Sequence, residues 1–322
     1  MVLLLFWAQV RGAETRPLLH DEFEKLNSHH RAELMGQDAQ QLFATATAGN
    51  NHRKNRYADI LALEATRVKL KAHRELLIDD SDYINANYID GEVPGSHQAY
   101  IACQAPLPAT LSHFWLMIWE SESAVIVMLT RLTERNQLKA SAYWPEGVGE
   151  RRQFGPFGVT HLRSEAISSH LTQRVFEVRH AGQTRQIVQL HYTEWPDFGT
   201  PGSTQTIREL AELVNAHKEA GRRAGLDGPI VVHCSAGVGR AGTFIAIHIN
   251  LEKMELQHSG SDQSVVVDIP RTVALLRQSR AGMVQTAEQY QFIYDVVRDA
   301  ARERSATGEY NTALTKQHHD EI

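Results

Sequence analysis

The residues best suited to chemistry stand at the two ends of a glycine-rich loop, Cys234-Ser-Ala-Gly-Val-Gly-Arg240. The apolar run from Pro229 to Val232 predicts a short buried strand before the loop, and the apolar-periodic segment from Phe244 to Leu251 predicts a helix after it. Glycines let several backbone N–H groups point inward, and the helix adds its positive N-terminal end. We therefore expect the loop to bind an anion.

The two end residues suit a reaction on a phosphate held in that loop. The guanidinium of Arg240 offers a planar fork to two oxygens of one phosphate. The same positive field stabilises a thiolate at Cys234, and a thiolate that faces a bound phosphate is a nucleophile for a phosphate ester. The pattern therefore predicts a phosphatase that works through a covalent cysteinyl intermediate.

This string, Cys-x5-Arg preceded by His233 and followed by Ala-Gly-Thr, resembles the active-site loop of protein tyrosine phosphatases. The resemblance extends over residues 20–300 and implies a non-receptor, tyrosine-specific enzyme with one catalytic domain. It implies a single highly twisted mixed β-sheet flanked by helices, and the interleaved strands and helices of the sequence independently favour this α/β (α+β) class. We expect an N-terminal extension at 1–17, the catalytic domain at 18–301 and a polar tail at 302–322. By the same resemblance the phosphate is bound by the residues between the two ends of the loop, namely Ser235, Ala236, Gly237, Val238 and Gly239.

A second match lies in Lys54-Asn-Arg-Tyr57-Ala-Asp59-Ile60. A basic loop taken alone is most often a solvated turn. This one is similar to the phosphotyrosine-recognition loop of the family, which implies that Tyr57 stacks on the substrate ring and that Asp59 accepts hydrogen bonds from the substrate backbone. A deep site of this kind favours phosphotyrosine over the shorter phosphoserine.

The predicted reaction also needs an acid, because displacing a tyrosine oxygen from phosphorus creates a phenolate. Trp195-Pro-Asp197-Phe-Gly199 resembles the acid loop of the family. Asp197 alone is equally a turn former, but a carboxyl on a mobile loop supplies the missing proton and later accepts one from water. Trp195 and Gly199 are then the expected hinge positions.

The resemblance implies further roles for residues that would otherwise be read as solvated surface or core. Glu134 is expected to pair with Arg240, with Lys139 beside it, and Gln285 to orient the hydrolytic water. The remaining expectations are substrate and phosphate contacts from Gln289, a bracing role for His233, and binding of acidic substrate groups by Arg277 and Arg280.

Two positions depart from the family pattern. Ala105 replaces the usual glycine of a Gln-Gly-Pro triplet, which we interpret as structural. Ala241 replaces the Ser or Thr whose hydroxyl helps the cysteine sulfur to leave. Loss of that bond costs roughly 1.5–3 kcal/mol, which is about tenfold to a hundredfold in the second step. We therefore expect an active but slow enzyme.

Composition fits a soluble globular protein of 322 residues, with 42% hydrophobic and 22% charged residues. The net charge of -5 argues against a nucleic-acid binder. Two cysteines, Cys103 and Cys234, form neither a disulfide framework nor a metal pattern, so we expect a reducing, cytoplasmic setting and an inert Cys103. No apolar run spans a membrane, and the apolar residues 1–8 favour an ordinary N-terminus over a signal peptide.

The predicted mechanism needs no metal or cofactor, its partners are phosphotyrosine-containing proteins in signal transduction, and we expect a monomer. Three other functions stay open: a phosphotyrosine-binding pseudophosphatase, a dual-specificity or lipid phosphatase, and a Cys–His hydrolase of amides. The last is disfavoured because adjacent residues on a strand, such as His233 and Cys234, point to opposite sides.

Overall fold

The computed structural model describes residues 12–71, 81–93, 96–258 and 266–306. The expectations for the apolar residues 1–8, and for the tail beyond residue 306, fall outside these described residues. Helix α2 begins at Gly12 and helix α9 ends at Ala306, so the expected domain limits near residues 18 and 301 both fall inside helices.

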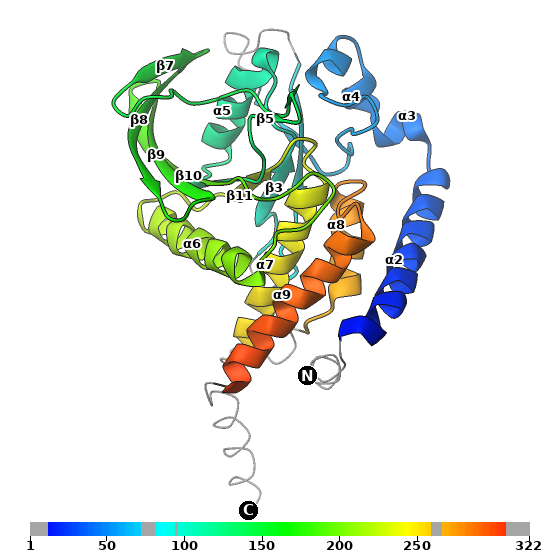
Figure 1. Cartoon of the computed structure of the whole chain (residues 1–322). Helices are drawn as coiled ribbons and strands as arrows, with labels where there is room; N and C mark the ends of the chain where they lie inside the picture. The colour runs from blue at the N-terminus through cyan, green and yellow to red at the C-terminus, as the bar shows by residue number, and fades with distance from the viewer. Residues whose placement is uncertain (1–11, 72–80, 94–95, 259–265, 307–322) are drawn as a thin grey trace, which may run out of the picture.

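A nine-stranded mixed sheet organises the described chain (Figure 1), in the order β1-β2-β3-β11-β4-β10-β9-β8-β7. The four central strands run parallel, and the pairs on either side are antiparallel. The strands of this sheet are β1 (Arg67–Lys69), β2 (Tyr83–Ile89), β3 (Tyr100–Cys103), β4 (Val125–Met128), β7 (Arg151–Phe154), β8 (Phe157–Ala166), β9 (Leu171–His180), β10 (Gln183–Tyr192) and β11 (Ile230–His233).

Helices cover both sides of this sheet. The α-helices are α2 (Gly12–Met35), α3 (Ala39–Leu42), α4 (Ala44–Thr47), α5 (Leu111–Glu120), α6 (Thr204–Arg223), α7 (Gly239–His258), α8 (Ile269–Ser279) and α9 (Ala287–Ala306). In Figure 1 strands β8 to β10 curve around α5, whereas α6 lies below them and α7, α8 and α9 gather beside α2. The expected twisted mixed sheet flanked by helices is confirmed.

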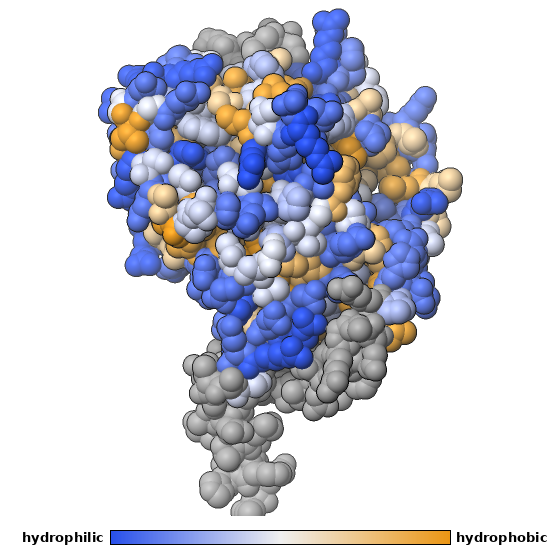
Figure 2. Space-filling view, viewed as in Figure 1, coloured by the Kyte–Doolittle hydropathy of each residue, from blue (hydrophilic) through white to orange (hydrophobic). Residues whose placement is uncertain are grey.

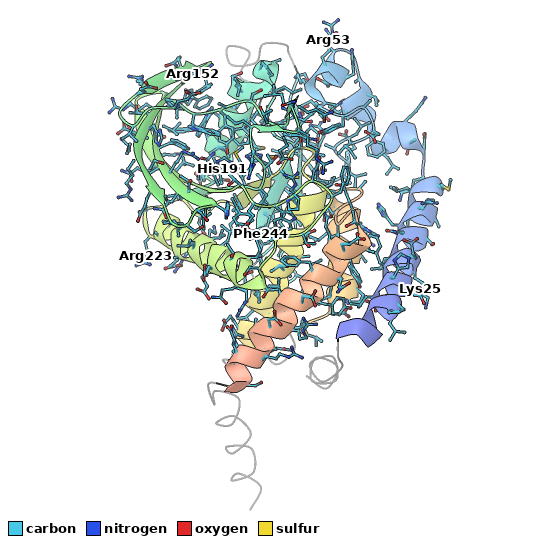
Figure 3. All side chains as sticks on the ribbon, viewed as in Figure 1. Lys25, Arg53, Arg152, His191, Arg223 and Phe244 are labelled. Atoms are coloured by element: carbon cyan, nitrogen blue, oxygen red, sulfur yellow. The ribbon has the colours of Figure 1, made fainter. Side chains whose placement is uncertain are left out.

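The centre of the sheet is buried on both faces. Every residue of β3, β4 and β11 is buried, which explains why these strands are short continuous apolar runs rather than alternating ones. Helix α7 follows β11 and is buried on all sides over its first three turns, up to Asn250. Figure 3 places Phe244 of this helix and His191 of β10 inside, whereas Arg152, Arg223 and Lys25 lie at the periphery.

The surface is polar by contrast. On the face shown in Figure 2, hydrophilic residues predominate and apolar residues form small scattered groups. The apolar side chains are thus concentrated inside, where buried β11 and the buried first turns of α7 hold both ends of the loop that connects them.

Two local features complete the fold. Helix α2 ends at Met35, and Asp38 then caps the short helix α3 by accepting a hydrogen bond from the N–H of Gln40 (2.9 Å). A small hairpin of β5 (Thr133–Glu134) and β6 (Gln137–Leu138) also forms. Its two turn residues both have positive φ, the geometry of a tight two-residue turn.

Candidate active site

The loop of residues 234–240, here called the Cys234 loop, connects β11 to α7. Its carbonyl groups accept hydrogen bonds from residues that surround the loop. The carbonyl of Ser235 accepts from the N–H of Ala105 (2.9 Å). The carbonyls of Ala236 and Gly237 accept from the guanidinium of Arg280 (2.9 Å each). The Val238 carbonyl completes the row by accepting from the N–H groups of Val284 (3.1 Å) and Gly242 (3.0 Å).

This row of outward carbonyls sets the direction of the loop amides. In a trans peptide the C=O and the following N–H point opposite ways, so the N–H groups of residues 236–239 face the inside of the loop. One of them, the N–H of Gly237, lies 3.2 Å from the Cys234 Sγ. Gly237 has φ +75°, and a Cβ there would lie 2.1 Å from the carbonyl oxygen of Cys103, so only glycine fits.

Arg240 is fixed by a fork of two charged hydrogen bonds. Its Nη1 and Nη2 donate to the two carboxylate oxygens of Glu134 at 2.7 and 2.6 Å, and Nη1 also donates to the Leu129 carbonyl at 3.1 Å. Burial acts to raise the pKa of Glu134, but the hydrogen bonds and charge of Arg240 outweigh it and lower that pKa. The β5–β6 hairpin therefore delivers the carboxylate that aims Arg240.

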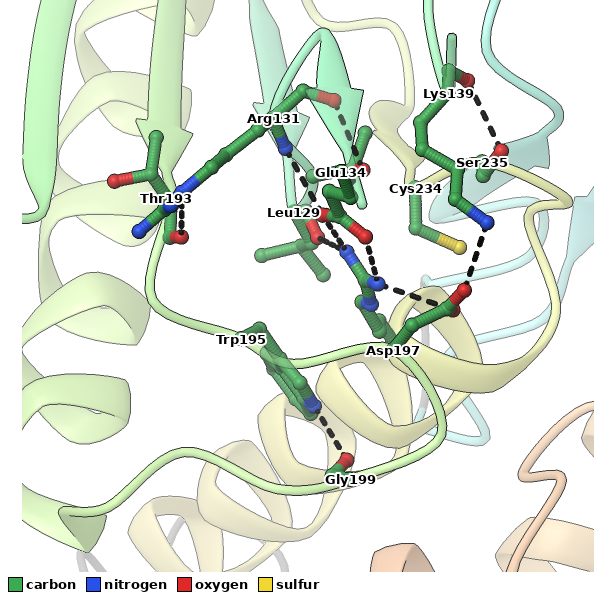
Figure 4. A network of polar contacts seen from close by, with 12 residues as sticks. Leu129, Arg131, Glu134, Lys139, Thr193, Trp195, Asp197, Gly199, Cys234 and Ser235 are labelled. Atoms are coloured by element: carbon green, nitrogen blue, oxygen red, sulfur yellow. Dashed lines mark hydrogen bonds and ion pairs between the residues drawn. The ribbon is translucent and has the colours of Figure 1, made fainter. Parts of the chain in front are cut away.

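Asp197 lies between two cations at the mouth of the site (Figure 4). Its Oδ2 accepts from Lys139 Nζ at 2.8 Å, and its Oδ1 lies 3.0 Å from Arg240 Nη2. The bond to Asp197 is the main cause that raises the pKa of Lys139. Asp197, Arg240 and Cys234 are thus brought together from segments far apart in the sequence.

The segment of residues 195–199, here called the Asp197 loop, is closed by hydrogen bonds at Gly199, whose N–H also donates to the Pro196 carbonyl (3.2 Å), and is strained at one residue. The indole N–H of Trp195 donates to the Gly199 carbonyl at 3.0 Å, so both expected hinge residues are tied to each other. Phe198 between them has φ +59° and is 61% exposed. A non-glycine residue in this left-handed region stores strain, as segments that move during function often do.

The segment of residues 54–60, here called the Tyr57 loop, is joined to the Cys234 loop through a pair of hydroxyl groups. Ser235 Oγ donates to the Lys139 carbonyl at 3.0 Å and lies 2.9 Å from the Tyr57 hydroxyl. Tyr57 is half-buried, whereas Asp59 is exposed to solvent. No role for Arg56 is predicted from the sequence, but its guanidinium donates to the carbonyls of Ala105 and Pro106 and so fixes the Tyr57 loop against the segment that follows β3.

Gln285 and Gln289 lie together against the opposite side of the Cys234 loop. The N–H of Gln285 donates to Gln289 Oε1 at 2.9 Å. A Cβ added to Gly239 would lie 2.4 Å from Gln285 Oε1 and 3.2 Å from Gln289 Nε2. Val284 just before them has φ +62°, a rare conformation for a β-branched residue.

The expectation that Arg277 and Arg280 bind acidic groups of a substrate is wrong. Both are buried, at 3% and 1% exposed, and their guanidinium groups are engaged inside the protein. Arg277 donates to the carbonyls of Met283 and Val284, and Arg280 donates to two loop carbonyls and to the side chains of Asn85 and Asn87. They shape the loops instead of facing a ligand.

His233 and Cys103 lie behind the site. Burial lowers the pKa of His233 to about 4, and its Nδ1 contacts the Cys234 carbonyl at 3.1 Å while Nε2 contacts the Tyr143 hydroxyl at 2.9 Å. Burial also raises the pKa of Cys103 to about 12, which keeps its thiol protonated at neutral pH. Neither side chain is placed to act as a base toward the Cys234 Sγ.

The family model for protein-tyrosine phosphatase matches residues 51–299. The chain belongs to the protein-tyrosine phosphatase family. The match covers the Tyr57 loop, the Asp197 loop, the Cys234 loop and both glutamines.

Curated relatives carry the same family name. The chain is 44% identical over 283 residues to tyrosine-protein phosphatase 3 of Dictyostelium discoideum, covering 87% of this chain and 28% of that protein. It is 41% identical over 254 residues to receptor-type tyrosine-protein phosphatase S of Gallus gallus, covering 78% and 16%. The chain therefore spans less than a third of either relative.

Solved structures agree in fold. The catalytic domain of human protein tyrosine phosphatase non-receptor type 18 superposes with a TM-score of 0.79 at 31% identity, covering 89% of this chain and 98% of that one. The same phosphatase in complex with a HER2 phosphopeptide gives a TM-score of 0.77 at 30% identity, covering 87% and 98%. Within the described residues, none of the helices has the length and apolarity that crossing a membrane requires.

Proposed function

We propose that this chain hydrolyses phosphotyrosine in proteins in two steps through a cysteinyl-phosphate. The observation that supports it best is the row of outward carbonyls at residues 235–238, which turns amide N–H groups inward around the Cys234 Sγ. Donors fixed in advance around a developing charge stabilise a phosphoryl transition state without reorganisation.

In the first step the Cys234 sulfur attacks phosphorus in line with the tyrosine oxygen. The loop amides and Arg240 hold the equatorial oxygens. Because Arg240 Nη2 contacts Asp197 in this structure, a bound phosphate competes for that nitrogen and frees Asp197 to protonate the leaving tyrosine. A sulfur–phosphorus bond forms, the phosphorus–oxygen bond breaks, and the proton ends on the phenol.

In the second step water attacks the cysteinyl-phosphate. Gln285 orients the water and Asp197 accepts its proton, while the sulfur leaves as a thiolate. Ala241 is fully buried beside the loop and its methyl group cannot donate a hydrogen bond to that sulfur. We infer that this step limits turnover.

The residues beside the Cys234 loop favour phosphotyrosine as the substrate. Tyr57 is joined to Ser235 at its hydroxyl, which places an aromatic ring beside the loop, and Asp59 is exposed and free to accept hydrogen bonds from a peptide backbone. The similar non-receptor type 18 phosphatase has been solved with HER2 phosphopeptides. We infer that this chain acts on phosphotyrosine proteins in signal transduction, as a monomer in a reducing compartment such as the cytoplasm, because its nucleophile must stay a free thiol.

The test is turnover of p-nitrophenyl phosphate and of matched phosphotyrosine and phosphothreonine peptides. Cys234→Ser is expected to abolish turnover, and Asp197→Ala to lower kcat by about 10²- to 10⁴-fold. Peptide binding without turnover by the unmodified protein would point to a pseudophosphatase instead. Equal rates on the two phosphopeptides would point to a dual-specificity enzyme.

A further inference from the structure

Arg174 of β9 has no place in the mechanism above, yet it begins two hydrogen-bond chains that end at the active site. Its Nη1 donates to Gln189 Oε1 at 2.9 Å and to His191 Nδ1 at 3.1 Å, and its guanidinium lies over the ring of Trp144, 5.1 Å from the centroid. An arginine side chain only donates hydrogen bonds. Arg174 therefore fixes which atoms of Gln189 and His191 must accept.

The first chain ends at the nucleophile. Gln189 turns its oxygen to Arg174, so its amide nitrogen donates to the Tyr143 hydroxyl at 2.7 Å. That hydroxyl then donates to His233 Nε2 at 2.9 Å, and His233 Nδ1 donates to the Cys234 carbonyl at 3.1 Å. A guanidinium that only donates stands at one end and a carbonyl that only accepts stands at the other, so every donor in between is determined.

The second chain ends beside the arginine clamp. Because Nδ1 of His191 accepts from Arg174, its Nε2 carries the proton and donates to the Thr130 carbonyl at 2.8 Å. The directed chain stops at this carbonyl, but it fixes the backbone of Thr130, whose hydroxyl lies 3.0 Å from Glu134 Oε1 and 3.1 Å from the Arg131 carbonyl, and Glu134 holds Arg240. Figure 3 shows His191 inside the molecule, where its ring also packs against that of Trp144 at 6.0 Å between centroids.

We propose that Arg174 is a positioning residue for the phosphatase reaction, one that sets the direction of both hydrogen-bond chains behind Cys234 and Arg240. This inference rests on the proposed function. A single side chain on β9 thereby aligns Cys234 and Arg240, although it contacts neither of them.

Burial explains why the direction matters. Gln189, Tyr143 and His233 are fully buried, so a reversed amide or the wrong imidazole tautomer leaves a donor facing a donor where water cannot intervene. Burial lowers the pKa of His191 and of His233 to about 4, with Arg174 lowering that of His191 further, so both rings are neutral at pH 7 and each has one tautomer to choose.

Three variants separate positioning from simple packing. Arg174→Met keeps the stem over Trp144 and removes the donor. Arg174→Lys keeps a donor, and because both bonds leave from one nitrogen, a single ammonium group is able to restore them. Arg185→Met is the matched control, since Arg185 also lies over an indole ring, that of Trp119 (3.9 Å), and donates to its carbonyl without leading to the site.

We expect Arg174→Met to lower kcat on a phosphotyrosine peptide by about 3- to 10-fold with KM nearly unchanged, Arg174→Lys to recover most of it, and Arg185→Met to lose none. Equal kcat values for Arg174→Met and Arg185→Met, or no recovery with lysine, would overturn the proposal.

Nitrogen NMR of the unmodified protein tests the proposal without any variant and without an activity measurement. The proposal requires a proton on Nδ1 of His233 and on Nε2 of His191, and the opposite tautomers would refute it even if the enzyme is active. A protein with these tautomers but no phosphatase activity would instead refute the proposed function alone.

Discussion

The two loops that meet at the active site are built in opposite ways. The Cys234 loop is buried, and four successive carbonyls are held by partners just after β3, on α7 and in the segment before α9. The Asp197 loop is held at its carboxylate by two ion pairs, its Asp197 side chain is 28% exposed, and Phe198 beside it is 61% exposed and strained.

The difference follows from what each loop must do. A loop that binds the transition state stabilises it most when its N–H donors are already in place and need no rearrangement. An acid that must admit a substrate and then cover it gains from contacts that can be exchanged, and the carboxylate of Asp197 is held by two side-chain ion pairs instead of by backbone hydrogen bonds.

Arg280→Met should do the greatest damage, because it releases the carbonyls of Ala236 and Gly237 and leaves buried acceptors unpaired. We expect kcat/KM to fall by about a hundredfold or more, and the free energy of unfolding by about 3–5 kcal/mol. Rapid-quench kinetics and urea unfolding measure the two effects.

Arg277→Met is the matched variant, because Arg277 donates to carbonyls in the segment before Gln285 and not to the Cys234 loop. It should keep the first-step burst and slow only the second step, and equal loss of the burst in both variants would remove the contrast.

Ala241→Ser should speed the second step. A hydroxyl at this buried position beside the Cys234 loop supplies the donor that the methyl group lacks. We expect steady-state kcat to rise by about tenfold to a hundredfold and the burst of p-nitrophenol to shrink. A linear time course from zero in the unmodified enzyme would contradict the premise that intermediate hydrolysis limits turnover.

Lys139→Met should have a moderate effect that is confined to the Asp197 loop. It removes one of the two cations on Asp197 and leaves the Lys139 carbonyl free to hold Ser235. We expect kcat to fall by about 3- to 10-fold without loss of thermal stability. Lys218→Met breaks the remote ion pair with Asp227 (2.9 Å) and should leave kcat unchanged. A similar drop in the two variants would argue against a specific role for Lys139.

Glu134→Gln should give a small, pH-dependent change in stability. The pKa of Glu134 is lowered in the folded protein, so its pairing with Arg240 stabilises above the unfolded-state pKa of about 4.3 and is lost as the pH falls through the folded pKa. The variant should be less stable by about 1–2 kcal/mol at pH 7, and the gap should narrow below about pH 4. Urea unfolding across this range measures it, and a gap that is constant with pH would exclude the linkage.

The sequence revealed the fold and the residues whose chemistry is distinctive. Cys234, Arg240 and Asp197 stand in strings that suit a phosphate ester and its leaving group, and the buried strands appear as apolar runs. It misled at Arg277 and Arg280, because a basic pair near a helix end suggests a solvent-facing site. Their acceptors are mainly backbone carbonyls, which no residue type records, and for Arg280 these lie more than forty residues away. The hydrogen-bond chains that start at Arg174 could not be predicted either, because their members come from segments far apart in the sequence.

The register of β11 has a consequence for how this chain can vary. The strand is bonded on both edges, with His233 opposite Cys103 on one side and Met128 on the other. Side chains alternate along a strand, so inserting or deleting one residue there would exchange the two buried faces of β11 and turn the sulfur to the opposite face of the sheet. We expect length changes between residues 230 and 233 to inactivate the protein even when every catalytic side chain is retained.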